Sequence, residues 1–113
     1  MTSVIAGLGE FHQVFFEEAA ENLDRFEQLL LDLDPARPED ESLHAIFRCA
    51  HSVKGGAATF GFDEMTALTH AMETLLDRLR RHEQPCSAGI VDTLLESGGL
   101  LREMLACRRR GGG

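Results

Sequence analysis

Hydrophobic residues recur every three or four positions along four stretches of the chain, the spacing of helices with one apolar face. The first stretch covers residues 9–33. It ends where two prolines stand close together within residues 34–38, because proline cannot continue a helix. Its apolar stripe consists of Phe11, Phe15, Ala19, Leu23, Phe26, Leu30 and Leu33.

Three further stretches show the same spacing. The second covers residues 40–59 and ends at Gly61. The third begins at Asp63, a candidate N-cap, and ends in a basic turn. The fourth follows Pro85 and is capped by Ser87. Four amphipathic helices with short connections predict an all-α antiparallel four-helix bundle. The stripe residues are Leu43, Ile46, Phe47, Ala50, Val53 and Ala57; Met65, Leu68, Met72, Leu75, Leu76 and Leu79; and Ile90, Val91, Leu94, Leu95, Leu101, Met104 and Leu105.

Composition agrees with helix packing around one core. The 113 residues are 43% hydrophobic, with no Trp or Tyr and few β-branched residues, which disfavours a sheet. We expect one domain over residues 1–110, followed by the start of a Gly linker or tail at 111–113.

Charge and cysteine usage exclude some classes of partner. A net charge of -8 repels nucleic acid and anionic membranes, and the basic run at 108–110 fits the C-terminal turn of a helix. Three widely spaced cysteines without a CxxC pair favour a reducing, cytoplasmic setting over a disulfide framework. The sequence shows no membrane span and no signal peptide.

The helical pattern also predicts the exposure of three side chains. We expect Cys49 on the outer side of its helix, and His12 and His82 exposed to solvent.

Two adjacent glycines stand inside the second predicted helix, where each costs about 1 kcal/mol relative to Ala. On a helical wheel, His51 lies at the edge of the apolar stripe and Gly55 lies nearly beneath it, one turn later. Ser52 and Gly56 fall further round the exposed side. One interpretation is a histidine that another protein can approach closely; the alternative is a glycine pair for helix packing beside an ordinary surface histidine.

Charged neighbours favour the first interpretation. Lys54 is three residues after His51, so it can reach a group attached to the imidazole. On the third stretch, Glu73 has the same rotational offset as His51, so the two point either into one groove or both away from it; the sequence leaves both arrangements open. A shared groove would let Glu73 hold Nδ1–H and leave Nε2 as a nucleophile. His70, further round the wheel, would be an outer hydrogen-bonding partner.

The segment 45–62, AIFRCAHSVKGGAATFGF, resembles the phospho-accepting helix of CheA-type chemotaxis histidine kinases. Residues 66–81 and 15–35 resemble the partner helix and the first helix of the same histidine-phosphotransfer (HPt) domain. The resemblance implies that His51 accepts phosphate from a CheA-type kinase domain and donates it to an aspartate of a CheY/CheB-like response regulator. It also places Lys54, His70 and Glu73 in the hydrogen-bonded surroundings of that histidine.

The resemblance further predicts what the domain needs from outside. The chain carries no nucleotide-binding signature, so a separate kinase domain, in cis or in trans, would supply Mg-ATP, the regulator would supply its own Mg, and the domain itself would hold no cofactor. The family's domain often continues into a fifth helix, which this chain lacks, truncates or replaces with RRRGGG. Regulator docking is expected around Arg48, Ser52, Gly55 and Gly56.

Two other functions are compatible with a helical bundle. A di-iron site needs two Glu-x-x-His motifs from different helices, and only Glu41-x-x-His44 has that order. A docking module without chemistry would explain the glycines. It gives no reason for His51, Lys54 and Glu73 to cluster.

Overall fold

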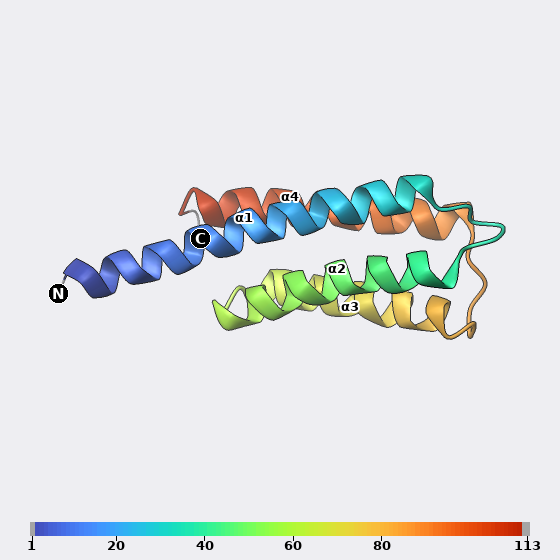
Figure 1. Cartoon of the computed structure of the whole chain (residues 1–113), viewed down its shortest axis with the longest axis horizontal. Helices are drawn as coiled ribbons and strands as arrows, with labels where there is room; N and C mark the ends of the chain where they lie inside the picture. Colours follow the sequence, from blue (N-terminus) through green and yellow to red (C-terminus); the bar gives the residue numbers. More distant parts are fainter. Residues whose placement is uncertain (1, 112–113) are drawn as a thin grey trace.

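The computed structural model describes residues 2–111, with side chains described from residue 11 onward. Within this part all regular secondary structure is helical, and the four helices run antiparallel in sequence order (Figure 1). Each helix packs against two neighbours, in the ring order α1, α2, α3, α4, and the bundle measures 55 × 22 × 21 Å. The helices are α1 (Thr2–Asp32), α2 (Asp40–Thr59), α3 (Asp63–Arg80) and α4 (Ala88–Arg109).

The predicted four-helix bundle is therefore confirmed, and the bounds of α2 agree with the sequence pattern at both ends. No fifth helix follows α4 in the part of the chain that the structure describes. The predicted start of α1 at Gly9 is wrong, because the helix begins at Thr2. A single glycine weakens a helix by about 1 kcal/mol but keeps its backbone N–H, so unlike proline it does not end one.

Helix ends explain how α2 and α3 are set side by side. Gly61 adopts φ 71°, and the N–H groups of Gly61 and Phe62 donate to the carbonyls of Ala58 and Ala57, as in a Schellman motif. The tight reversal begins α3 at Asp63. The N-cap is thus Phe62, which makes no side-chain capping bond, so the prediction of an Asp63 cap is wrong.

The fourth helix begins as predicted. The Ser87 hydroxyl oxygen accepts a hydrogen bond from the Ile90 N–H at 3.2 Å. At its other end, Arg108 and Arg109 occupy the last turn, where cations interact favourably with the helix dipole.

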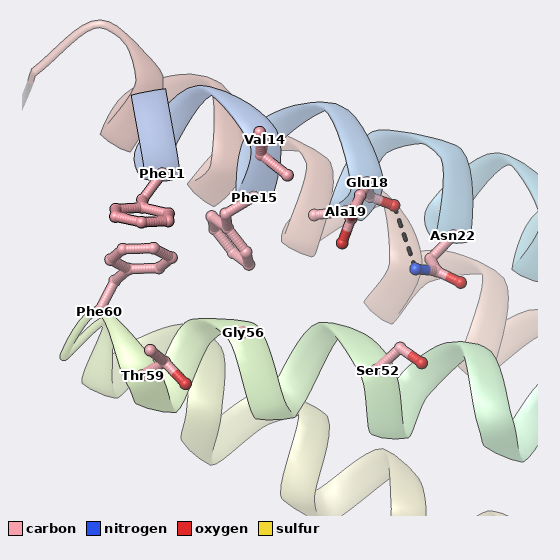
Figure 2. Close-up of a pocket in the computed structure, with 10 residues that line it drawn as sticks. All are labelled: Phe11, Val14, Phe15, Glu18, Ala19, Asn22, Ser52, Gly56, Thr59 and Phe60. Carbon is pink, nitrogen blue, oxygen red and sulfur yellow. Dashed lines mark hydrogen bonds between the residues drawn. The ribbon is translucent and has the colours of Figure 1, made fainter. Parts of the chain in front are cut away.

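Apolar side chains from all four helices meet in one core. Phe11 is an exception to the predicted stripe, with 65% of its surface exposed. Figure 2 shows its ring opposite that of Phe60, the C-cap residue of α2. The first turns of α1 extend beyond the α2–α3 turn (Figure 1). The fully buried large side chains are Phe26, Leu30, Leu43, Ile46, Met65, Leu76, Leu94 and Leu101.

Two other exposure predictions are also wrong. Cys49 is buried, and its burial raises the pKa of its thiol. The reason is that α2 packs against α1 as well as α3, which widens its buried arc beyond one stripe. His12 is half-buried, with its ring centroid 4.5 Å from that of Phe60. His82 is exposed as expected, and its Nε2 lies 3.0 Å from the Asp40 carboxylate.

The two adjacent glycines of α2 have different surroundings. A Cβ atom at Gly55 would meet nothing within 4 Å, whereas one at Gly56 would lie 2.5 Å from Cδ1 of Phe15. That ring is 7% exposed and packs against Phe16, Phe60 and Phe62, so it has little room to move. Gly56 therefore lets α1 approach α2, and only Gly55 leaves open surface beside His51.

We expect Gly55→Ala and Gly56→Ala to affect stability differently, although both replace a helical glycine with the same residue. Each gains about 1 kcal/mol of helix propensity, but Gly56→Ala also overpacks the Phe15 ring, at a cost of roughly 1–3 kcal/mol. Urea unfolding should show Gly55→Ala more stable than the wild type. Its unfolding free energy should also exceed that of Gly56→Ala by the cost of overpacking the Phe15 ring. Equal unfolding free energies for the two variants would contradict the packing role of Gly56.

Candidate functional site

His51 on α2 and Glu73 on α3 meet in the groove between the two helices. The imidazole Nδ1 lies 2.5 Å from Glu73 Oε1, and the connection joins residues 22 positions apart in sequence. Of the two arrangements compatible with the sequence, the structure thus has the shared groove. Glu73 is 6% exposed, while 62% of the His51 side-chain surface faces solvent.

The hydrogen bond determines which nitrogen of His51 is available. Glu73 accepts at Nδ1, so a neutral imidazole carries its proton on Nδ1 and keeps a lone pair on Nε2. Because the ring is largely exposed, that lone pair is on the solvent side of the site. The arrangement can therefore present an uncharged nitrogen nucleophile to an approaching molecule.

Lys54 completes the pairing of the buried carboxylate. Its Nζ forms an ion pair with Oε2 of Glu73, so each carboxylate oxygen has a partner from α2. Since Lys54 and His51 are one helical turn apart, a single carboxylate can bridge them. The sequence placed Lys54 near a group attached to the imidazole; the structure shows it bound to Glu73 beside that imidazole.

The same contacts keep Glu73 ionised. Burial acts to raise the pKa of this carboxyl group, but hydrogen bonds from Lys54 and His51 and their charges outweigh it and hold the pKa below its ordinary value. A buried carboxylate without such partners would be strongly unfavourable. Glu73 therefore remains an acceptor for Nδ1–H at neutral pH.

Sequence reasoning missed two contacts of this site. Phe47, which it assigned only to the apolar stripe, has its ring 6.0 Å from the His51 ring at an interplanar angle of 9°. Arg80, one of the cations in the basic turn that ends α3, lies over Phe47, with Cζ 3.7 Å from the ring centroid. The four-residue spacing from Phe47 to His51 was the available signal, because residues at i and i+4 are neighbours on a helix.

His70 lies at the margin of the site. It lines a shallow groove of about 240 Å³ together with Lys54, Glu73 and Arg80. Its imidazole is exposed and makes no hydrogen bond or ion pair within the described residues, so its part in the hydrogen-bonded surroundings of His51 stays a prediction.

On its other side, α2 borders a groove of about 370 Å³ shared with α1 (Figure 2). Figure 2 shows Ser52, Gly56 and Thr59 of α2 facing α1 across this groove, with the rings of Phe11 and Phe60 opposite one another at its end. Of the four residues expected to dock a partner, Arg48, Ser52 and Gly55 are exposed, while Gly56 lies beneath Phe15.

Metal ligands do not gather around these residues. Among the side chains that the structure describes, no group of three or more His, Cys, Asp or Glu residues is placed to hold a metal ion. The Glu41-x-x-His44 motif therefore has no second set of ligands there. Within the same range, none of the helices has both the length and the apolar character needed to cross a membrane.

Comparison with known proteins gives one consistent family. A model of the Hpt domain matches residues 10–109. The chemotaxis protein CheA of Klebsiella aerogenes is 50% identical over 98 residues, which is 87% of this chain, and CheA of Rhizobium meliloti is 34% identical over 106 residues, which is 94%. The chain spans only 15% and 14% of the length of these two proteins.

Two solved structures have the same fold. The CheA phosphotransferase domain from Thermotoga maritima has a TM-score of 0.79 and 30% identity, covering 86% of this chain and 92% of that one. The phosphorylated P1 domain of CheA3, in complex with CheY6 from R. sphaeroides, has a TM-score of 0.83 and 26% identity, covering 91% and 81%. The bundle is therefore shared with phosphotransfer domains over nearly its whole length.

The low pKa of Glu73 predicts how stability depends on pH. Because the folded-state pKa lies below the ordinary value of 4.5, the stabilisation is present above pH 4.5 and is lost as pH falls through the folded-state pKa. We expect Glu73→Gln to lower the unfolding free energy at neutral pH by an amount on the order of 1 kcal/mol. The difference from the wild type should shrink below pH 4.5.

Urea unfolding between pH 7 and pH 3 measures this difference, with Glu96→Gln on exposed α4 surface as the matched control. The control should follow the wild type at every pH. A wild type and Glu73→Gln that differ equally at all pH values would contradict an ionised, partnered Glu73.

Proposed function

The chain belongs to the Hpt domain family, as the phosphotransferase domain of CheA does. On that basis we propose that His51 is its phospho-accepting residue. The observation that carries the proposal is the bond between His51 Nδ1 and the buried Glu73 carboxylate at 2.5 Å. That bond selects the tautomer with a free lone pair on Nε2, the exposed side of the ring. Gly55, one turn after His51, has open space around it, so no side chain at that position crowds the imidazole.

Phosphoryl acceptance follows as an in-line displacement. The Nε2 lone pair forms a bond to the terminal phosphorus of ATP, the bond from that phosphorus to the bridging oxygen breaks, and ADP leaves with the electron pair. The ring then carries substituents on both nitrogens and a positive charge. Glu73 offsets that charge through Nδ1–H, so the same carboxylate that selects the tautomer also stabilises the product.

Transfer to a regulator reverses the roles. A regulator aspartate oxygen attacks the phosphorus, the bond from phosphorus to Nε2 breaks, and the electron pair returns to the imidazole. Lys54 is close enough to the site to share its charge with the phosphoryl group, because it is one turn from His51 on the same helix. His51 is therefore a nucleophile in the first step and a leaving group in the second.

The partners of this domain follow from its relatives. A CheA-type kinase domain, in cis or in trans, is the donor and holds Mg-ATP; a CheY-like response regulator is the acceptor and holds its own Mg. The domain itself needs no cofactor. Support comes from the CheA3 domain, which is phosphorylated and in complex with CheY6, and from the exposed Arg48, Ser52 and Gly55 around His51. With such partners the domain acts in the cytoplasm.

Intact-mass analysis after incubation with Mg-ATP and a CheA-type kinase core tests the proposal. Wild type should gain one acid-labile phosphoryl group, which a CheY-like regulator removes, and His51→Gln should gain none. His44→Gln is a useful control, because it alters another imidazole of α2 outside the site and should still be phosphorylated. Unmodified wild type with several kinase cores, in folded protein, would favour a docking module without chemistry.

The tautomer argument makes a separate kinetic prediction. Glu73→Gln loses a charged partner of Nδ1–H, which should slow phosphoryl acceptance by roughly ten- to a hundredfold. Lys54→Ala should have a weaker effect, mainly on the lifetime of the phosphorylated form. Rapid-quench measurement of phosphorylation and of its decay separates the two, with Glu96→Gln as control. Wild-type rates for a folded Glu73→Gln would refute the role of the carboxylate.

A further inference from the structure

The hydrogen bond to Glu73 alone would leave the His51 ring free to turn. Glu73 holds a single atom of the imidazole, Nδ1, and the side chain is 62% exposed. A ring held at one atom can pivot about that contact and swing its far nitrogen, Nε2, through an arc. In-line attack needs the lone pair aligned with the breaking bond, so a second contact that limits this motion increases the reactive population.

Phe47 supplies such a contact. It stands one turn before His51 on α2, and the two rings are nearly parallel, at 9°, with centroids 6.0 Å apart. Ring pairs with an offset at this separation attract each other beyond simple burial. Both residues are on one helix, which fixes the spacing of their backbones but not the orientation of the Phe47 ring. That orientation therefore depends on what holds the ring from α3.

Arg80 holds it. Its Cζ lies 3.7 Å from the centroid of Phe47, a cation over an aromatic face, and its Nε donates to Asp77 Oδ1 at 2.8 Å. The other oxygen of Asp77 lies 3.1 Å from Nε of Arg81. The Arg80 hydrogen bond lowers the pKa of Asp77, so the carboxylate that fixes the guanidinium is ionised at neutral pH.

We propose that Phe47, held by Arg80 and Asp77, is a positioning residue that aims His51 Nε2 for phosphoryl transfer between proteins. The inference rests on the proposed function of His51. Glu73 determines which nitrogen reacts, and Phe47 determines where that nitrogen points. Phe47 does not touch the reacting atoms; it acts through the imidazole.

The test compares Phe47→Leu, which removes the aromatic face, with Phe47→Tyr, which keeps it. Arg80→Gln removes the guanidinium over the ring without changing the buried core. Phe62→Leu is the matched control, since Phe62 is also half-buried but lies at the α2–α3 turn, among the other phenylalanines. Each protein is first checked for folding by urea unfolding.

Single-turnover phosphorylation by a CheA-type kinase core then gives the maximal rate and the half-saturating concentration separately. We expect Phe47→Leu to lower the maximal rate by roughly two- to tenfold with the half-saturating concentration unchanged. Arg80→Gln should lower it by less, and Phe47→Tyr and Phe62→Leu should react like the wild type. Phosphoramidate, a small donor that can approach from any direction, should phosphorylate all the variants at the wild-type rate.

A spectroscopic measurement reports the ring geometry itself. Loss of the parallel Phe47 ring should shift the His51 ring protons in Phe47→Leu, and Phe47→Tyr should keep them in place. Unchanged proton shifts in Phe47→Leu, or an altered half-saturating concentration with an unchanged maximal rate, would overturn the inference.

The two proposals fail differently. Wild-type kinetics for Phe47→Leu, in a series where the wild type itself is phosphorylated, would overturn the positioning role alone. No phosphorylation of the wild type would overturn the proposed function, and this inference with it.

Discussion

The buried carboxylate of Glu73 is the constraint on which the site depends. A carboxylate removed from water needs partners for its charge and its oxygens, and α2 supplies both from one turn, through His51 and Lys54. Those contacts require α2 and α3 to lie side by side in one register. The left-handed turn at Gly61 sets that register, because it reverses the chain with only three residues between the helices.

The second constraint is that α2 packs on two sides. Its contacts with α1 bury Cys49 and place Gly56 under the Phe15 ring, while its contacts with α3 bury the partner of His51. Only a narrow exposed arc remains, and His51 and Gly55 lie on it. The adjacent glycines therefore have separate causes: one permits close packing of helices, and the other leaves the surface beside the imidazole open.

The sequence predicts more of the fold than of the site. Periodicity fixed four helices and both ends of α2, because a 3.6-residue repeat and strong breakers act locally. It misplaced Cys49, since a wheel gives the angle of a residue on its own helix but not how many neighbours pack there. For the same reason it left two arrangements open for His51 and Glu73. The stacking of Arg80 on Phe47 joins residues of two different helices and depends on how those helices pack, so no local sequence pattern predicts it.

Phosphorylation of His51, as proposed, would change the charges of the site in a way that the structure accommodates. The phosphoryl group adds roughly two negative charges to a domain that already carries a net charge of -8, which by itself opposes the product. The ring simultaneously becomes cationic, and its charge lies against the Glu73 carboxylate at 2.5 Å. The added anion is on the exposed nitrogen, in water, where repulsion from distant carboxylates is screened. The attraction between the cationic ring and Glu73 thus acts over a short, buried contact, whereas the repulsion between the phosphoryl group and other carboxylates acts over longer distances in water. This balance keeps the phosphorylated state accessible from both the donor and the acceptor side of the transfer.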